Sequence, residues 1–573
     1  MSLPKLPRGH LPPTQETPIA TARWAFPYEL EKYAYKEGDI WLGILPIPRE
    51  EDLPELQLLE ARRDAVAQDQ SLDAQTQADA LAEIDDRIAE LSSGDELAIG
   101  LDDDRHMATK GSTRAGKGTS CIVPNLCLYP GSVICIDPKG ENASITAARR
   151  GMGARDIDGL GQTVAVLDPY DTTKLADDFK AAWNPLDMLD VEDDMVVDRA
   201  TSVAEALVVR TNPEHAHFDE SARSLIKAII LYVALVHEGR PDRTLITVYD
   251  YLMRGAVEQL EADRREEGPS PDDPDAFTYL LFLMRRRDEF DGIIAGAAMT
   301  ILGMGDRERG SVLSTARRNM EFVERPAMQR VLAASSFDLD AIKTDPAGVS
   351  LFLCLPPQRM PDCGRWLRLV INMALNRMYE LDEPPATGRP VLFLLEEFAS
   401  LGHMEIIEHA AGYAAGFGVK LWMIIQDVPQ LKRHYKDGWE TLLGNAGVIQ
   451  AFANSDETTL AFLSKKLGEA EVVQRVRNTS TNLSASTNDP GEYARMSGLM
   501  ANPQSTGHSA STSDALNEQI QRTPLLLPDE IERLFKRENM DQLVLIKGEV
   551  PMILTRTNYF EHPRFAGMVR MER

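Results

Sequence analysis

The sequence predicts an α/β protein in which a largely parallel sheet is interrupted by a helical region. Two observations lead to this class. Short apolar, β-branched runs bounded by Gly or Pro are typical of buried strands, and segments with a 3.6-residue apolar period separate them. Such alternation places crossover helices between parallel strands. The predicted strands are 132–137, 163–168, 349–355, 391–396, 420–425 and 448–453, and the pattern is helical from about 190 to 325.

The N-terminal part is predicted to form an arm (1–54) and a helical hairpin (55–94). The first 20 residues are Pro-rich and extended, and 22–35 form a small ordered segment. Residues 55–93 contain neither Pro nor Gly, and their apolar positions follow a helical period. One helical face carries Leu81, Ile84, Ile88 and Leu91. We expect an antiparallel hairpin inserted between two short strands, with a structural or partner-binding role.

The rest of the chain divides into three parts. Residues 95–189 and 326–573 carry the predicted strands, and 190–325 form an all-α region with a polar loop at 263–275. The Ser-, Thr- and Asn-rich stretch 478–514 is predicted to be a mobile loop because it has few apolar residues. The run QLVLIKGEVPMILTR predicts a C-terminal β-hairpin that closes the sheet.

The composition is that of a soluble globular protein with a formal net charge of −28. Because so acidic a molecule repels nucleic acid as a whole, nucleic-acid contact requires a local basic surface, such as the lumen of a ring. The five cysteines form no CxxC pair, which predicts buried thiols and no disulfides. No apolar run reaches about 18 residues, so no transmembrane helix is expected.

The segment GSTRAGKGTS is similar to a phosphate-binding loop. Such a loop needs glycines so that backbone N–H groups can approach phosphates, a Lys, and a following helix N-terminus. The strict pattern places Ser or Thr after the Lys, where this chain has Gly118. For this segment alone, a solvent-exposed Gly loop is the alternative. The candidate nucleotide-binding residues are Gly111, Ser112, Thr113, Arg114, Ala115, Gly116, Lys117, Gly118 and Thr119.

Two acids, Glu396 and Glu397, follow the apolar run 391–396. A buried strand that ends in acids delivers carboxylates to the carboxyl edge of the sheet, where ligands bind in open α/β folds. Glu396 would hold Mg²⁺, usually through water, and Glu397 would orient or deprotonate the attacking water. The alternative is that both acids cap a helix N-terminus, where the helix dipole favours them.

Gln426 ends the predicted strand at 420–425. Ring ATPases often place a polar residue there to sense the γ-phosphate, and an ordinary strand-end residue is the alternative. Each of these three features could arise by chance. Chance alone seldom places a loop with a Lys, a pair of acids and this Gln in one chain in this order. We therefore predict a P-loop ATPase that uses ATP and Mg²⁺, with Lys117, Glu397 and Gln426 as catalytic residues and Glu396 and Thr119 as metal ligands.

Longer segments resemble the TraG-like coupling proteins of type IV secretion. These segments are GKGTSCIVPNLCLYPGSVICIDPKGEN, LFLLEEFASLGHM, AGFGVKLWMIIQDVPQL and TLLGNAGVIQAFANSDETTLAFLSKKLG. The resemblance covers about 20–57 and 95–565, and the signatures P-N-L, D-P-K-G-E and Q-D-x-x-Q-L are specific to the group. It implies a RecA-like nucleotide-binding domain interrupted by an all-α domain and assembled into a ring, usually a homo-hexamer.

The resemblance also implies partners and a place in the cell. A coupling protein of this kind delivers relaxase, effector or DNA cargo to the components of a type IV secretion channel. Single- or double-stranded DNA would occupy the ring lumen, and the protein would lie in the cytoplasm at the inner-membrane face. Arg307 and Arg309 are candidates for an arginine that reaches a neighbour's nucleotide, with an exposed charge cluster as the alternative.

Three features bear on how far the resemblance extends. Members of the group often carry Gly after the Lys, so Gly118 agrees with it, and either Thr119 or water would complete the Mg²⁺ shell. The acidic pair usually reads Asp-Glu, so Glu396 predicts reduced or altered hydrolysis. The usual N-terminal transmembrane pair is missing, which implies either a truncated chain or recruitment by a membrane partner, with the 55–93 hairpin as a surface for it.

Three functions follow from these observations. The leading one is a motor ATPase that drives DNA or effectors into a secretion channel. The second is a substrate-receptor platform, in which the all-α region docks cargo and nucleotide only fixes assembly. The third is a DNA pump of the FtsK and HerA kind, against which the D-P-K-G-E segment argues.

Overall fold

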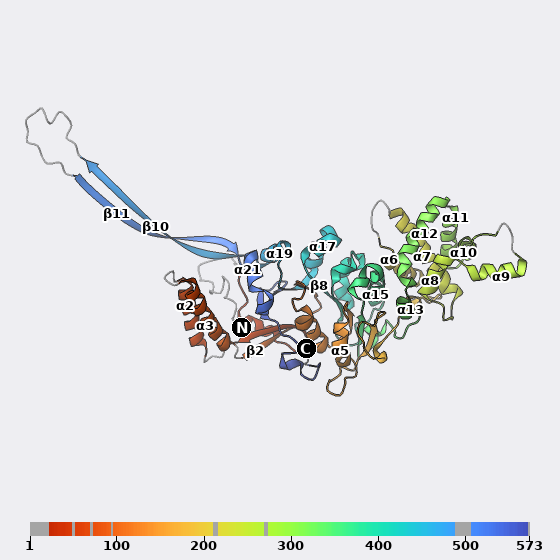
Figure 1. Ribbon diagram of the computed structural model, residues 1–573, viewed down its shortest axis with the longest axis horizontal. Helices are drawn as coiled ribbons and strands as arrows, with labels where there is room; N and C mark the ends of the chain where they lie inside the picture. Colours follow the sequence, from red (N-terminus) through yellow and green to blue (C-terminus); the bar gives the residue numbers. More distant parts are fainter. Residues whose placement is uncertain are drawn as a thin grey trace, which may run out of the picture.

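The computed structural model describes residues 22–47, 52–68, 73–92, 95–209, 216–268, 273–487 and 506–570. In these residues a large sheet covered by helices forms the body, an all-helical region lies at one end, and a long two-stranded hairpin projects from the other (Figure 1). The predicted α/β class is therefore confirmed. Within the same described ranges, no helix has both the length and the hydropathy of a membrane span.

The sheet joins a parallel half to an antiparallel half. Its order is β2-β1-β13-β12-β9-β3-β8-β7-β4-β6-β5. The pairs from β9 to β5 are parallel, and those from β2 to β9 are antiparallel. The strands are β1 (Ile40–Ile47), β2 (Asp95–Leu101), β3 (His106–Gly111), β4 (Val133–Ile136), β5 (Thr163–Leu167), β6 (Val349–Leu353), β7 (Val391–Leu395), β8 (Val419–Ile425), β9 (Ala446–Phe452), β12 (Asp541–Ile546) and β13 (Met552–Thr555).

All six predicted strands are present, and they are buried on both faces except at the start of β5, where Thr163 is exposed. In β4, Ile134 and Ile136 belong to one hydrophobic cluster, whereas Val133 and Cys135 belong to another. Helices therefore cover each face of the parallel half, which explains the unbroken apolar runs in its strands. The first helices along the chain are α1 (Pro27–Leu30), α2 (Leu53–Gln68), α3 (Ala74–Ser92), α4 (Val123–Leu128) and α5 (Glu141–Arg150). Those after the helical region are α14 (Ala341–Thr344), α15 (Met360–Glu380), α16 (Glu405–Tyr413), α17 (Val428–Tyr435), α18 (Trp439–Asn445), α19 (Glu457–Leu467) and α21 (Pro528–Leu534).

One prediction about the antiparallel half is wrong. The C-terminal hairpin is present as β12 and β13, but it lies inside the sheet between β1 and β9, so it does not close the sheet. The edge strands are β2 and β5. Strand β1 belongs to the predicted arm (1–54) and is the first of the two short strands expected around the helical hairpin. Strand β1 pairs with β13 and with β2, so the sheet continues beyond the C-terminal hairpin.

The predicted helical hairpin is present as α2 and α3, between the paired strands β1 and β2. Its small core joins Leu56 to Ile84, Ile88 and Leu91. Arg87 of α3 pairs with Glu55 of α2, with 3.0 Å between Nη2 and Oε1. The apolar face predicted from the sequence is therefore buried between the two helices of the hairpin.

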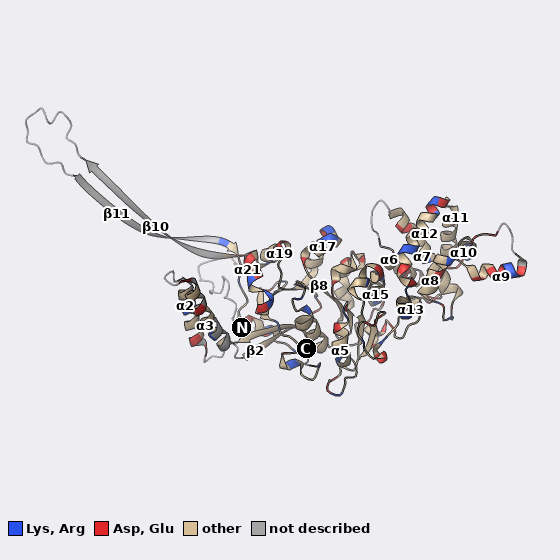
Figure 2. Cartoon of the chain, in the orientation of Figure 1, with Lys and Arg blue, Asp and Glu red and all other residues tan. Residues whose placement is uncertain are grey.

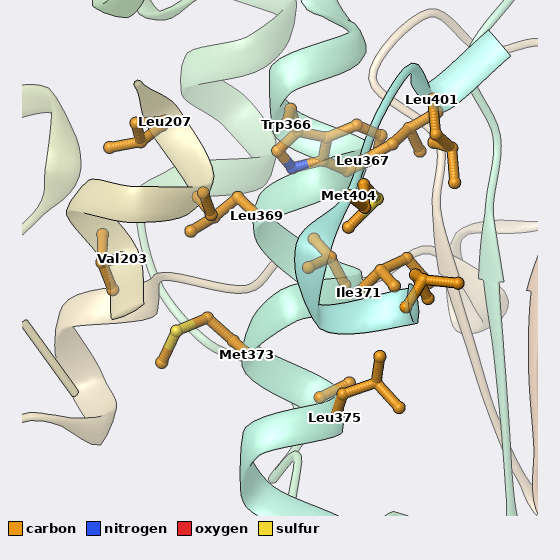
Figure 3. Packing of buried hydrophobic residues seen from close by; sticks show 14 of the residues in the cluster. Val203, Leu207, Trp366, Leu367, Leu369, Ile371, Met373, Leu375, Leu401 and Met404 are labelled. Atoms are coloured by element: carbon orange, nitrogen blue, oxygen red, sulfur yellow. The ribbon is translucent and has the colours of Figure 1, made fainter. Parts of the chain in front are cut away.

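The all-helical region interrupts the sheet between β5 and β6. Its helices are α6 (Val196–Leu207), α7 (Ala216–Val236), α8 (Leu245–Arg254), α9 (Val257–Glu267), α10 (Ala276–Met284), α11 (Ile293–Gly303), α12 (Asp306–Met320) and α13 (Pro326–Leu332). Helix α15 connects it to the body. Figure 3 shows Val203 and Leu207 of α6 on one side of α15 and Leu401 and Met404 on the other. The predicted polar loop at 263–275 is wrong in part, because α9 continues through Glu267.

The long hairpin consists of β10 (Glu469–Thr487) and β11 (Thr506–Pro524). The two strands pair from Glu469 with Pro524 to Thr487 with Thr506. The expectation of a mobile loop at 478–514 is therefore wrong for 478–487 and 506–514, and 488–505 lie outside the described residues. Few apolar residues indicated a loop, but Thr, which recurs in this stretch, is a common strand residue.

Candidate functional site

The phosphate-binding loop lies between β3 and a helix. The chain leaves β3 at Gly111, turns, and enters a π-helical turn (Gly118–Ile122) that continues into α4. The turn requires positive φ at Arg114 (61°) and Gly116 (92°). Only Gly adopts such values without strain, so Gly116 has a conformational reason to be Gly.

Lys117 is held across this loop. Its side chain is buried, and Nζ donates hydrogen bonds to the carbonyl oxygens of Gly111 (2.6 Å) and Ser112 (3.0 Å). Burial lowers the pKa of Lys117, while the charges of Glu397 and Glu396 act in the opposite direction. The ammonium group is therefore fixed at the loop with the two predicted acids close enough to influence it.

Gly118 faces open space. A Cβ built on it would meet no atom within 4 Å, so packing does not require Gly there. The hydroxyl of Thr119, one residue on, instead lies within 2.9 Å of Asn558 Oδ1 and 3.2 Å of the Gly116 carbonyl oxygen, to which it can donate. The hydroxyl proton of Thr119 is thus directed toward the protein, and a metal-binding role for Thr119 stays a prediction.

Glu396 belongs to a group of buried polar side chains at the ends of β7 and β4. Asn142 Nδ2 donates to Glu396 Oε2 (2.8 Å) and lies 3.5 Å from Asp137 Oδ1. Burial and the nearby Asp137 raise the pKa of Glu396 to about 7, and burial raises the pKa of Asp137 to about 6. Asp137 was not among the predicted site residues, although it begins the D-P-K-G-E signature. Two carboxylates with shifted pKa values in one place are typical of functional sites.

Glu397 and Gln426 lie beside the loop and contact each other. Gln426 Nε2 donates to both carboxylate oxygens of Glu397, at 3.1 and 3.0 Å. Thr113 Oγ1 donates to Gln426 Oε1 at 3.2 Å. The loop, the acidic strand end and the polar strand end are therefore joined by hydrogen bonds. Glu397 precedes a short 3₁₀ helix, but its side chain makes no capping hydrogen bond there, so the capping alternative lacks support for Glu397.

Residues of the C-terminal segment contact the phosphate-binding loop. Arg556 Nη1 donates to the Ala115 carbonyl oxygen (2.8 Å), and its guanidinium lies 4.0 Å from the ring centre of Phe452. The Tyr559 backbone N–H donates to the Thr119 carbonyl oxygen (3.0 Å). Arg556 and Tyr559 were not predicted, because they lie more than 400 positions from the loop and form no local pattern with it.

The donor set fits a nucleotide with Mg²⁺. Within the described ranges, no group of three or more His, Cys, Asp or Glu side chains is arranged to hold a metal by itself. Mg²⁺ usually binds through one or two carboxylates together with substrate phosphates and water. Glu396 at the strand end, opposite a loop that leaves space beside Gly118, suits this mode.

Arg307 and Arg309 lie on α12, in the all-helical region and not at the loop (Figure 1). Arg309 pairs with Asp306, with 2.6 Å between Nη2 and Oδ1. Figure 2 shows basic and acidic residues interspersed on α9 and around α12. This arrangement favours the exposed charge cluster for these two residues.

Comparison with known proteins decides the family. The family described as Type IV secretory system Conjugative DNA transfer matches residues 71–571. The chain belongs to this family. Conjugal transfer protein TraG of Escherichia coli is 26% identical over 80% of this chain and 68% of its own length. Protein VirD4 of Agrobacterium fabrum is 26% identical over 79% of this chain and 58% of its own length. The predicted relationship to type IV secretion coupling proteins is therefore confirmed.

Solved structures of the plasmid coupling protein TrwB share the fold. The complex of TrwB with the ATP analogue ADPNP has a TM-score of 0.52 at 16% identity, covering 80% of this chain and 86% of that chain. The complex of TrwB with ADP and Mg²⁺ has a TM-score of 0.53 at 16% identity, covering 81% and 88%. This likeness confirms that the chain has the predicted RecA-like P-loop fold with an all-helical region.

Proposed function

We propose that this protein is an ATP-driven coupling protein that recruits DNA, relaxase or effector cargo and drives its delivery to a type IV secretion channel. The observation that carries the proposal is the hydrogen-bonded chain from Thr113 through Gln426 to Glu397. It joins the phosphate loop to the strand ends that act on the γ-phosphate in P-loop ATPases. The names of TraG and VirD4 and the nucleotide complexes of TrwB support the same function.

Each site residue has a role in hydrolysis under this proposal. The loop 111–119 binds the nucleotide phosphates through its backbone N–H groups, and Lys117 neutralises charge at the β- and γ-phosphates. Glu397 orients and deprotonates the attacking water, and Gln426 holds the Glu397 carboxylate and senses the γ-phosphate. Bound Mg²⁺ would supply a Lewis acid at the phosphate oxygens, and Glu396 is the side chain that would hold it.

The proposed assembly is a homo-hexamer around DNA, at the cytoplasmic face of the inner membrane. Membrane attachment would come from partners or from a segment outside this sequence. Because the chain carries a net charge of −28, like subunits repel each other, and the repulsion is screened over about 8 Å at physiological salt. Assembly therefore follows mass action and is favoured by nucleotide, DNA or channel components that bridge the subunits.

Steady-state phosphate release from ATP, with and without single- and double-stranded DNA, tests the proposed function. Lys117→Ala in the same chain is the control for contaminating ATPases. DNA-stimulated turnover that the control lacks is the expected result. Nucleotide binding without turnover would instead support the receptor-platform function, in which nucleotide only fixes assembly.

A further inference from the structure

A groove with a volume of about 570 Å³ lies on the same edge of the sheet as the nucleotide site. Three loops line it, and each follows a parallel strand: 138–141 after β4, 170–174 after β5 and 356–359 after β6. These three strands are neighbours in the sheet, next to β7. The groove therefore continues the ligand-binding edge away from the phosphate loop.

Three cations line the groove: Lys139, Lys174 and Arg359. Lys139 and Lys174 are exposed, and among the described residues no ion pair joins any of the three to an acid. The lining also holds two acids: Asp171 is paired with Lys180, with 3.0 Å between Oδ1 and Nζ, and Glu141 begins α5. In a protein of net charge −28, three cations without acidic partners in one groove mark a place where an anion is favoured.

Hydrogen bonds hold the backbone of the loop after β5 in place. The Asp168 carboxylate accepts hydrogen bonds from the backbone N–H groups of Thr172 (2.9 Å) and Thr173 (2.7 Å) and from the Thr173 hydroxyl (2.9 Å). Asp171 and Lys174 adopt positive φ values of 53° and 52°. Non-glycine residues in this region cost energy and persist where the surrounding structure fixes them, often at ligand sites. The hydrogen bonds therefore hold the backbone of the loop that carries Lys174.

An aromatic ring lies in the same groove. The guanidinium of Arg359 lies 5.4 Å from the ring centre of Tyr170, and the Tyr170 hydroxyl lies 3.4 Å from Cys363 Sγ. The ring is half-buried, held at its hydroxyl end and flanked by a cation. Aromatic rings next to basic side chains suit single-stranded nucleic acid, because the bases stack while the cations bind the backbone.

The groove lies close to the nucleotide site. The charge of Lys139 acts electrostatically on Lys117, and both follow strands of the same sheet edge. A phosphate bound at Lys139 would therefore lie on the same sheet edge as a nucleotide on the loop. Such proximity is useful in an enzyme that couples hydrolysis to movement of a polymer.

We propose that Lys139, Lys174, Arg359 and Tyr170 form a phosphate-binding groove for the backbone of a nucleic acid strand. The choice of nucleic acid rests on the proposed function. The same chemistry could come from the γ-phosphate of a nucleotide held by a second copy of this chain. Three cations and an aromatic ring in so large a groove favour the nucleic acid, because a single γ-phosphate needs neither the length nor the ring.

The test measures binding of a fluorescent oligothymidylate of about 20 nucleotides by anisotropy over a range of salt, without hydrolysis. The groove variant combines Lys139→Gln, Lys174→Asn and Arg359→Gln, with Asn chosen because it tolerates positive φ. The control variant Arg240→Gln, Arg254→Gln and Arg286→Gln removes the same charge from exposed positions of the helical region. We expect at least tenfold weaker binding for the groove variant and a salt slope shallower by about 2, since each phosphate contact contributes about 0.7.

A variant with Lys139→Arg, Lys174→Arg and Arg359→Lys keeps the charges and should bind within about threefold of the parent, which excludes a folding defect. If oligothymidylate binding is kept but self-association with an ATP analogue is lost in the groove variant, the phosphate comes from the neighbour's nucleotide. Equal weakening by groove and control variants, or no change in either measurement, overturns the groove. If the parent shows no ATP turnover while the groove variant loses oligothymidylate binding, the proposed function is rejected and the groove is kept.

Discussion

The proposed ligand-binding edge of the sheet has two halves that differ in how their polar groups are held. On the half formed by β3, β8 and β7, Lys117, Gln426 and Glu397 bond to neighbouring protein groups and lie buried or half-buried. On the half formed by β4, β6 and β5, Lys139 and Lys174 are exposed and lack acidic partners among the described residues. A hydrogen-bonded network fixes the positions of the side chains that hydrolysis needs. Cations without acidic partners instead suit a ligand that binds and later dissociates.

The largest expected effect is on the first half. Lys117→Ala removes the ammonium group that the Gly111 and Ser112 carbonyl oxygens hold at the loop. We expect turnover to fall on the order of 10²–10³-fold and ATP affinity to weaken, since charge at the β- and γ-phosphates is no longer neutralised. Steady-state kinetics and titration with a fluorescent nucleotide measure both. Turnover equal to that of the parent would remove the loop from the mechanism.

Glu397→Gln tests whether the second acid acts chemically. The amide has the size of the carboxylate but cannot take a proton, so hydrolysis should fall by about 10²–10⁴-fold while ATP binding is kept. Single-turnover hydrolysis and nucleotide titration separate the two effects. Because Gln426 donates to Glu397, the variant places two amides together, and loss of binding would show that this contact is structural.

The first half could be predicted from the sequence because its residues lie either directly after an apolar strand or in a local loop pattern. Glu396 and Gln426 mark strand ends, and Lys117 sits in a recognisable loop. The second half could not, because its three loops are separated in the chain and meet only when β4, β6 and β5 pair. The support from Arg556 was hidden for the same reason.

The fold shows the same limit. Strands buried on both faces are continuous apolar runs, and all six were predicted. Strand β3 was not, because Thr109 and Lys110 interrupt its apolar residues. Lys110 is nevertheless buried, with Nζ 3.6 Å from the ring centre of Phe462 on α19, a contact that no local pattern reveals. The place of β12 and β13 inside the sheet likewise depends on β1, about 500 residues earlier.

A smaller effect is expected at the boundary between the two halves. Glu396→Asp restores the family's usual acid but shortens the side chain and removes its hydrogen bond to Asn142, worth about 1 kcal/mol. We expect turnover to be kept or raised, with a few-fold change at most. Steady-state kinetics at varied Mg²⁺ measures it. An inactive or unfolded variant would show that the site has packed around Glu.

The smallest effect is expected at Gly118. A Cβ there meets nothing within 4 Å, so Gly118→Ser should fold normally and gain about 0.5 kcal/mol from better helix propensity. Its hydroxyl would stand where the strict loop pattern places it, so Mg²⁺-nucleotide affinity should rise modestly. Gly116→Ser is the matched control, because φ of 92° should make it destabilising. Equal destabilisation by both, in thermal unfolding, would contradict the open space at Gly118.

Under both proposals, the two halves of this edge bind different phosphates. The affinities of a fluorescent nucleotide and of oligothymidylate for two variants, Lys117→Ala and the groove variant, distinguish two sites from one. We predict that Lys117→Ala weakens nucleotide binding at least tenfold more than oligothymidylate binding, and that the groove variant does the reverse. If both variants weaken both ligands in the same proportion, the edge is a single site and the account is wrong.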